Sequence, residues 1–262
     1  MRRFAPLAAM VLALAFTAGG ARPAAAERMV VSLSNHRVEI TSNFTGTDLV
    51  LFGTVEPDKG KTTRAAGYDL VVTVTGPRQN YRTRRKGRVM GIWVNADSRE
   101  FVNVPSYLAV LSNRPVKEIS QPQVLRRLQI GLDNFILTQR IGPDFADTVA
   151  DDPFRVAFVR LKTDQGLYRQ SPTAVTFLTP AVFRAAIPLP ADARTGTYDV
   201  DVKLFADGAL VTQTKTALEV IKTGFEQYVA EGAADYGLLY GILTVLMSLF
   251  IGWLASVIFR KD

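Results

Sequence analysis

Residues 237 to 259 read GLLYGILTVLMSLFIGWLASVIF, a stretch of 23 residues without a charged side chain that is followed directly by Arg260-Lys261-Asp262. An α-helix rises about 1.5 Å per residue, so the stretch is long enough to cross a hydrocarbon core of about 30 Å. The sequence therefore predicts one transmembrane helix over 237–259. Cations that follow such a helix favour the cytoplasmic side, so the tail 260–262 is expected there.

The other end of the chain has the pattern of an export signal. Arg2 and Arg3 precede an apolar run over 7–18, and 24–26 supply the small residues after which a signal peptidase cleaves. We expect residues 1–26 to be a signal peptide, with an uncleaved amino-terminal anchor as the alternative. Together the two ends predict a single-pass protein of the cell inner membrane, with the bulk of the chain in the periplasm and the carboxyl terminus in the cytoplasm.

The terminal helix also carries small residues along one side. At about 100° per residue they share an arc of roughly 120°. In lipid, close backbone approach along such a face drives helices together, because the lipid tails are as apolar as leucine. The alternative is that small residues are simply common in membrane helices. We expect this face to contact an integral membrane protein or a second copy of the chain; it comprises Gly237, Gly241, Thr244, Ser248, Gly252, Ala255 and Ser256.

Composition excludes several classes of protein. The chain has no cysteine, so it has no disulfide framework, thiolate metal site or lipid anchor on cysteine. Its formal net charge is +7, but Arg2, Arg3 and Arg22 belong to the export signal. An exported protein meets little nucleic acid, so the basic balance does not predict that partner. The bilayer is the partner that the composition does predict.

The exported body has the pattern of a mainly β protein. Short stretches rich in Val, Leu, Ile and Thr alternate with turn residues over 29–112 and again over 167–221. This predicts two immunoglobulin-like β-sandwich domains with a helical segment between them. The expected divisions are an N-terminal sandwich over 27–117, a helical pair and a second sandwich over 118–222, and a juxtamembrane stalk helix over 223–236.

Local signals place individual elements within the body. The apolar spacing over 121–137 predicts a helix, and Asp152-Pro153 has the pattern of a helix start with Asp at the cap. In the helix that begins there, one face is expected to carry Phe154, Ala157, Phe158 and Leu161. Asp207-Gly208 predicts a two-residue hairpin turn. A strand is expected over 88–95.

The sequence gives no catalytic motif. It has no Gly-x-Ser-x-Gly elbow, phosphate-binding glycine loop or HExxH, and its one histidine, His36, lies in an expected turn. We therefore expect no enzyme activity, cofactor or metal. A Ser–Lys hydrolase remains a third alternative, because composition does not rule it out.

One basic stretch stands out in the body. If 81–89 is extended, alternate cations share one face of the strand, and a row of cations favours an anion or an acidic partner. The alternative is a solvated hairpin whose charges keep a sheet edge from pairing. The candidate contact residues are Arg78, Arg82, Arg84, Arg85, Lys86 and Arg88, with no acidic residue among them.

Several short blocks give the chain a resemblance to a known family. They are 38–46 (VEITSNFTG), 51–53 (LFG), 183–190 (FRAAIPLP), 196–200 (GTYDV), and Tyr240-Gly241 with Gly252-Trp253. Taken together, these blocks make the whole mature chain similar to an uncharacterised transmembrane protein family of alphaproteobacteria. The family has no assigned activity, so the resemblance implies no catalytic residue. Its members are often encoded beside permeases of the sulfite/organosulfonate exporter type, which implies an accessory role.

The first reading of function is thus a non-enzymatic, membrane-anchored periplasmic accessory protein, and in its concrete version an accessory to such a permease. The second is a periplasmic receptor for a small anion that uses the basic stretch.

Overall fold

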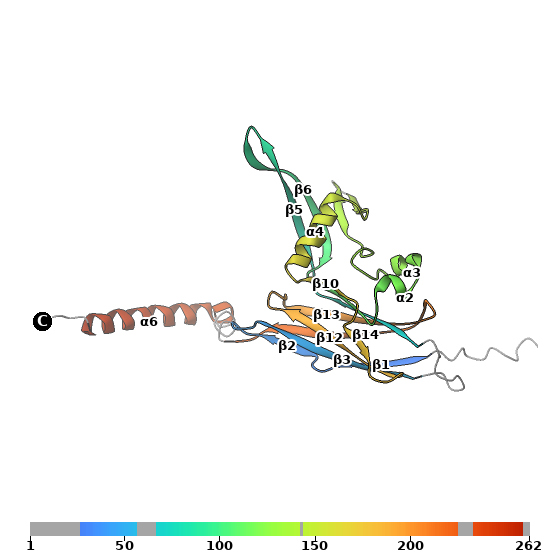
Figure 1. Cartoon of the computed structure of the whole chain (residues 1–262). Coiled ribbons are helices and arrows are strands. Elements are labelled where there is room, and N and C mark those ends of the chain that lie inside the picture. Colours follow the sequence, from blue (N-terminus) through green and yellow to red (C-terminus); the bar gives the residue numbers. More distant parts are fainter. Residues whose placement is uncertain (1–26, 57–66, 142–143, 225–232, 259–262) are drawn as a thin grey trace, which may run out of the picture.

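The computed structural model describes residues 27–56, 67–141, 144–224 and 233–258. The strands of this part of the chain form three sheets (Figure 1). The first sheet has the order β1-β3-β12-β11, with β1 at Arg28–Leu33, β3 at Gly46–Glu56, β12 at Val182–Pro190 and β11 at Val175–Phe177.

The second sheet has the order β10-β7-β4-β13-β14-β2 and packs against the first. Its strands are β10 (Tyr168–Ser171), β7 (Leu108–Ser112), β4 (Asp69–Thr75), β13 (Gly196–Ala206), β14 (Ala209–Lys222) and β2 (Arg37–Ile40). The pairs β10–β7 and β14–β2 are parallel, and the other pairs are antiparallel.

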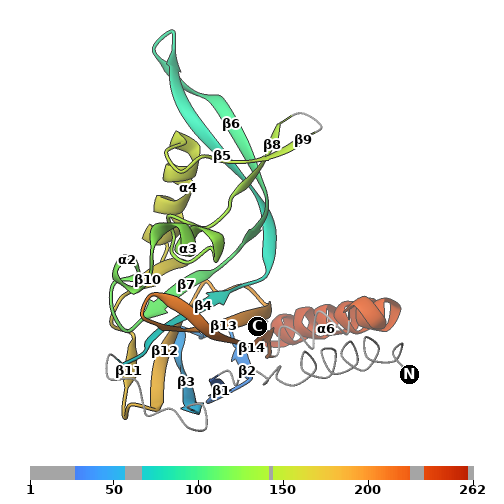
Figure 2. The same cartoon turned by 90° about the vertical axis from the view of Figure 1, so that its right-hand side faces the viewer.

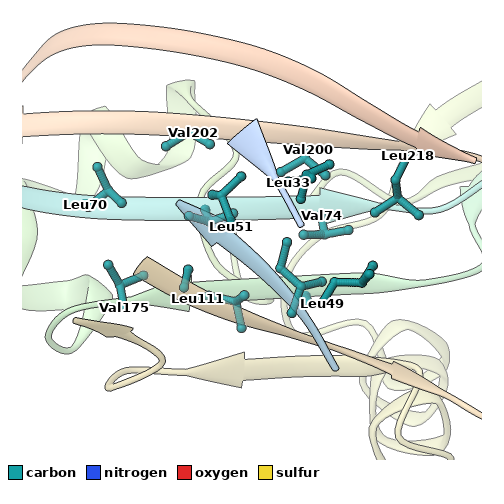
Figure 3. Close-up of a cluster of buried hydrophobic side chains, with 14 of the residues drawn as sticks. Leu33, Leu49, Leu51, Leu70, Val74, Leu111, Val175, Val200, Val202 and Leu218 are labelled. Carbon is teal, nitrogen blue, oxygen red and sulfur yellow. The ribbon is translucent and has the colours of Figure 1, made fainter. Parts of the chain in front are cut away.

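The main core lies between these two sheets (Figure 3). Successive side chains of a strand point to opposite faces. Strand β12 accordingly buries Phe183, Ala185, Ile187 and Leu189, while the residues between them are exposed or half-buried. The side chains of Leu49 and Leu51 meet those of Val74, Val200 and Val202 from the opposite sheet. A β-sandwich is the layer arrangement that buries both apolar faces.

A helical layer covers the outer face of the second sheet. Helices α2 (Val116–Ile119) and α3 (Pro122–Arg127) pack Val116, Ile119 and Leu125 against Val71, Val110 and Phe205. Strands β4, β7 and β13 are thereby buried on both faces over part of their length. This explains their continuous apolar runs, because a strand covered on two sides need not alternate.

The third sheet has the order β5-β6-β8-β9, and its first two strands form a long hairpin (Figure 2). Strand β5 spans Arg78–Val89, β6 spans Ile92–Pro105, β8 spans Thr138–Ile141 and β9 spans Asp144–Asp147. Helix α4 (Pro153–Asp164) lies alongside the lower part of the hairpin (Figure 1). Phe101, Phe158 and Tyr168 join these elements in a second core.

The two separate immunoglobulin-like domains are not confirmed. Strand β3 pairs with β12, β4 with β13, and β2 with β14, so strands from 27–117 and 118–222 lie in the same two sheets. Sequence periodicity identifies strands but not their pairing partners. In the structure these strands pair with strands that lie far away in the sequence.

Two other local expectations need correction. The helix expected over 121–137 ends after Arg127, because Gln129 and Gly131 take positive φ values of 54° and 98° and turn the chain toward β8. The strand expected over 88–95 is interrupted by a hairpin turn at Met90-Gly91, so that 88–89 end β5 and 92–95 begin β6. Met90 and Gly91 have φ values of 48° and 83°, as a two-residue turn between twisted strands requires.

Three other local signals are confirmed. Asp152 Oδ1 accepts hydrogen bonds from the backbone N–H of Phe154 at 2.9 Å and of Arg155 at 3.1 Å, which starts α4 at Pro153. Asp207 and Gly208 form the turn between β13 and β14 with φ values of 51° and 78°. Helix α6 spans Gly237–Ile258, is long and apolar enough to cross a membrane, and has no buried side chain.

Several expectations lie at or beyond the limits of the described residues. Residues 1–26, assigned to the export signal, and the tail 260–262 are outside them. The expected stalk helix is described only at 223–224 and from 233, with a helical segment at 233–235.

Candidate functional site

The β5–β6 hairpin extends beyond the rest of its sheet. Its pairing runs from Arg78 opposite Pro105 to Val89 opposite Ile92, whereas β8 pairs with β6 only at Phe101. The outer part is therefore a two-stranded ribbon, and nearly every side chain from Arg84 to Ser98 is exposed. Such a ribbon is only marginally stable in water by itself.

The tip of this ribbon is apolar, although its flanks are charged. Met90 is 98% exposed, Ile92 67%, Trp93 66% and Val89 53%. Contiguous exposed apolar side chains of this size mark surfaces that contact a protein or a membrane. We call Val89, Met90, Ile92 and Trp93 the hairpin tip.

The structure distributes the six predicted cations along β5 with different partners. The Arg78 Nη1 donates to the carbonyl oxygen of Asn103 at 3.0 Å, and Arg82 lies 4.0 Å from a Glu100 carboxylate oxygen that Arg140 also approaches. Arg85 pairs with Asp97 across the hairpin.

The remaining three cations are less engaged. Arg88 Nε donates to the Gly91 carbonyl oxygen at 3.4 Å, a long hydrogen bond. Arg84 and Lys86 have no ion pair or hydrogen bond with any described residue. Strand alternation places Arg82, Arg84, Lys86 and Arg88 on one face, but only Arg82 and Arg84 reach the cleft described next.

A cleft of about 680 Å³ opens at the base of the hairpin. The free edge of β5 forms one wall, the second half of α4 forms another, and the 191–195 connection between β12 and β13 forms the third. We call it the hairpin cleft. It is lined by Tyr81, Arg82, Thr83, Arg84, Ser106, Phe158, Leu161, Lys162, Gln165, Leu167, Asp192, Ala193 and Arg194.

Lys162 is the most unusual side chain in the hairpin cleft. It is 7% exposed, and no carboxylate among the described residues lies within ion-pair distance of it. Its Nζ lies 3.8 Å from the centroid of the Tyr81 ring and 5.8 Å from that of Phe158. Burial, and secondarily the charge of Arg194, lower the pKa of Lys162 to about 8. Aromatic faces attract a cation but do not neutralise it.

Ser106 adds a second unsatisfied polar group. It is 1% exposed, and its Oγ has no hydrogen-bond partner among the described residues. Buried hydroxyls are nearly always hydrogen-bonded, so an unsatisfied hydroxyl in a residue that lines a cleft is unusual. No hydrogen bond joins Ser106 Oγ to Lys162 within the part of the chain that the structure describes, so the two do not form a contacting nucleophile–base pair.

Arg194 closes the cleft from the third side. The carbonyl oxygen of Arg194 accepts a hydrogen bond from the buried Tyr198 hydroxyl at 2.7 Å, which fixes the connection that carries this exposed cation. Asp192 is exposed and is the one acid among the described lining residues. The cleft thus gathers Arg82, Arg84, Lys162 and Arg194 around a partly aromatic floor.

Sequence reasoning missed Lys162 because the buried face of α4 differs from the expected one. The structure buries Phe154, Arg155, Phe158 and Lys162, whereas Leu161 is 49% exposed. The one available signal was that Lys162 follows Phe158 by four residues and therefore shares its side of the helix. Solvent exposure of a lysine there would have been the ordinary expectation.

Helix α4 carries a second buried cation, Arg155, whose guanidinium is hydrogen-bonded within the fold. Its Nη2 donates to the carbonyl oxygens of Asp133, at 3.3 Å, and of Phe135, and its Nη1 donates to Thr148 Oγ1 at 3.4 Å. Burial lowers the pKa of Arg155, but the guanidinium is supplied with acceptors. Arg155 therefore serves the fold by tying α4 to the preceding connection.

A second polar cleft lies on the outer face of the second sheet. It has a volume of about 410 Å³ and is lined by residues that include Asp199, Asp201, Lys203 and Lys215. We call it the sheet cleft. Lys203 is 5% exposed and pairs with Asp201, whose carboxylate also accepts hydrogen bonds of 2.8 and 2.9 Å from Gln213.

The predicted packing face of α6 is exposed along its whole described length. A side chain added at Gly237, Gly241 or Gly252 would meet no atom within 4 Å. Thr244 and Ser248 donate their hydroxyls to the carbonyl oxygens four residues earlier, both at 2.8 Å. These two hydroxyls are therefore satisfied within the helix, as a helix in lipid requires.

The described residues contain no group of three or more His, Cys, Asp or Glu side chains arranged to hold a metal ion.

Comparison with known proteins gives a family match and distant structural likenesses, one of which is to an adhesin. The curated proteins contain no match. The crystal structure of the N-terminal domain of the Streptococcus gordonii adhesin Sgo0707 is 10% identical, with a TM-score of 0.25. The match covers 74% of this chain and only 32% of the adhesin domain. At this level of similarity it supports no conclusion about either fold or function.

The family match is far more extensive. The family model described as "Putative transmembrane protein (Alph_Pro_TM)" matches residues 28–261, which includes the sandwich, the hairpin and helix α6. The chain therefore belongs to the Alph_Pro_TM family of transmembrane proteins.

Proposed function

We propose that this protein is a non-enzymatic, membrane-anchored accessory protein whose β-rich body recognises an integral membrane partner. The observation that carries the proposal is the hairpin tip, where Met90, Ile92 and Trp93 are each at least 66% exposed. Exposing these side chains to water costs free energy, and they do not contribute to the hydrophobic core. Trp is also among the residues that contribute most to protein interfaces.

The topology proposed with this function follows from the two ends of the chain. The export signal expected over 1–26 places the body in the periplasm, and helix α6 crosses the inner membrane toward a cytoplasmic Arg260-Lys261. Helix α6 supports the anchor, since it is apolar over Gly237–Ile258 and wholly exposed.

A second contact is proposed for the small-residue face of α6. Gly241 and Gly252 leave room for another helix to approach the backbone, and this is how helices associate in lipid. The proposed partner class is an integral membrane protein. A permease of the sulfite/organosulfonate exporter type is the candidate that the family resemblance suggests, and self-association is the alternative.

Site-specific photo-crosslinking in intact cells tests this function. A photoreactive amino acid is placed at Met90 on the tip, at Gly241 on the helix, or at the exposed Thr197 of β13 as the control. The proposal predicts crosslinks from positions 90 and 241 to the same integral membrane protein, and none from position 197. Absence of that protein at position 90, or equal capture at position 197, would contradict it.

The same assay tests whether the cations of β5 contribute to partner binding. Arg85 is paired with Asp97, whereas Arg84 has no such partner. If the row of charges guides partner binding, Arg84→Glu and Arg85→Glu lower the yield of the crosslink at position 90. An unchanged yield favours the alternative, in which the charges only prevent the β5 edge from pairing with another strand.

A receptor for a small anion is the second candidate function. It is favoured by a different observation, the gathering of cations in the hairpin cleft. The third reading, an envelope hydrolase, receives less support, because Ser106 and Lys162 are not hydrogen-bonded to each other.

A further inference from the structure

The buried positive charge of the hairpin cleft lacks the partner that a folded protein normally supplies. Lys162 is 7% exposed, and no described carboxylate lies within 4.0 Å of its Nζ. Drawing an ammonium group even partly out of water costs free energy unless another charge or acceptor compensates. The ring of Tyr81, 3.8 Å away, compensates only in part.

The groups around Lys162 increase this excess of positive charge. Arg194 lines the cleft on the 191–195 connection, and its charge acts on Lys162. Arg84 lines the cleft without an ion pair or hydrogen bond to any described residue. Arg82 lies 4.0 Å from a Glu100 carboxylate oxygen, which it shares with Arg140. The exposed Asp192 offsets one of the cations. The cleft therefore carries a net positive charge, and an anion placed between Lys162 and Arg194 would lower the energy of both.

Ser106 supplies an independent indication that a ligand belongs here. Ser106 lines the same cleft, and its Oγ is buried and has no partner among the described residues. A hydroxyl can rotate to donate a hydrogen bond to an anionic oxygen that reaches it. The site thus offers two kinds of donor, charged and neutral, to one ligand.

The remaining lining determines the kind of anion. Tyr81, Phe158 and Leu161 give the cleft an apolar floor, and its volume of about 680 Å³ is well above that of a bare oxyanion. Ligand pockets of this size typically combine apolar walls with a few polar groups that fix orientation.

We propose that the hairpin cleft binds a small organic anion, with its charged oxygens at Lys162, Arg194 and Ser106 and its apolar part against Tyr81 and Phe158. This site deepens the anion-receptor candidate and does not depend on the accessory role, because none of its contacts uses the hairpin tip. It also moves the expected anion site from the row of cations on β5 to the floor of the cleft.

Calorimetric titration of the full-length protein in uncharged dodecyl maltoside micelles tests the proposal. The probes are phenyl phosphate, which has an anionic head and an aromatic part, and inorganic phosphate, which has the head alone. We expect saturable binding of phenyl phosphate at one site, and weaker binding of inorganic phosphate by about fivefold or more, because it leaves the apolar floor uncovered.

Three variants make the outcome specific. Lys162→Gln is expected to weaken phenyl phosphate binding by about tenfold or more, and Arg194→Gln, an exposed change that spares the core, by several-fold. Lys215→Gln is the matched control, since it removes the same charge from the sheet cleft and should leave affinity unchanged.

The proposal is overturned if phenyl phosphate does not bind saturably, if Lys162→Gln and Arg194→Gln bind it as tightly as the wild type, or if Lys215→Gln loses as much affinity. Equal affinity for the two probes would overturn the assignment of an organic anion. Failure here, with the crosslink at position 90 intact, would leave the accessory function standing.

Discussion

The hairpin cleft and the sheet cleft each contain an almost wholly buried lysine, and the fold treats the two charges in opposite ways. Lys203 in the sheet cleft pairs with Asp201, and Gln213 holds that carboxylate from the other side. Lys162 in the hairpin cleft faces the rings of Tyr81 and Phe158. The exposed fractions of the two lysines are nearly equal, at 5% and 7%.

The difference distinguishes a lysine whose charge is neutralised by the fold from a lysine whose charge can still attract a ligand. In the sheet cleft the positive charge is neutralised within one strand, which leaves little attraction for an external ion. In the hairpin cleft the charge is compensated only in part, by aromatic rings, so either the folded state accepts the remaining cost or a ligand removes it. Burial by itself therefore does not identify a functional lysine, and its partners must be examined too.

The largest expected effect comes from breaking the neutralised pair. Lys203→Met leaves the Asp201 carboxylate without its cation, and should lower the free energy of unfolding by roughly 2–3 kcal/mol. Chemical unfolding of the full-length protein, followed by far-UV circular dichroism at pH 7, measures it. The double variant Lys203→Met/Asp201→Asn should recover part of the loss. A single variant as stable as the wild type would show that the pair contributes nothing.

The corresponding change in the hairpin cleft should have the opposite sign. The pKa of Lys162 is lowered to about 8 in the folded protein from 10.5, so the unfolded state binds more protons between these pH values. Wild-type stability should therefore rise with pH across that window. Lys162→Met removes the buried charge and should stabilise the protein by about 2 kcal/mol at pH 7.

The pH profile provides the check on that prediction. Stability curves of Lys162→Met and the wild type should converge as pH rises from 8 to 10.5, since both side chains are then neutral. A destabilised Lys162→Met at pH 7, or a gap independent of pH, would mean that the lysine already has compensation within the fold.

Anion binding should respond to the same titration with a smaller effect. Affinity for phenyl phosphate is expected to fall about tenfold from pH 7 to pH 9.5, as Lys162 loses its proton. Burial raises the pKa of Tyr81, so ionisation of that phenol does not account for the loss. Lys162→Arg should move the decline to higher pH; a parallel decline in that variant would assign it to another group.

The smallest expected effect concerns Ser106. Because its Oγ has no partner in the described structure, Ser106→Ala should leave the free energy of unfolding unchanged or raise it by up to about 1 kcal/mol. The same change should weaken phenyl phosphate binding by a few-fold, through the loss of one donor. A marked loss of stability would indicate that the hydroxyl is satisfied within the fold.

The hairpin illustrates what local sequence could and could not predict. The extended, basic strand over 81–89 is found within β5, since its alternation is a property of neighbouring residues. The bend at Met90-Gly91 was missed because methionine seldom takes a positive φ and the pair lacks the usual Asn-Gly signature. At the exposed end of the ribbon the structure places apolar side chains, which the charges of the flanking strand do not indicate.

The sequence by itself determined the elements whose causes are local: the apolar length of α6, the Asp152 cap of α4, the Asp207-Gly208 turn and the β character of the body. Only the tertiary structure decided that β3 pairs with β12 and that Lys162 meets Tyr81 and Arg194 in one cleft. The physical reason is that capping, turns and membrane length depend on residues a few positions apart. Strand partners and the environment of a buried charge depend on side chains that lie far apart in the chain and meet only when it folds.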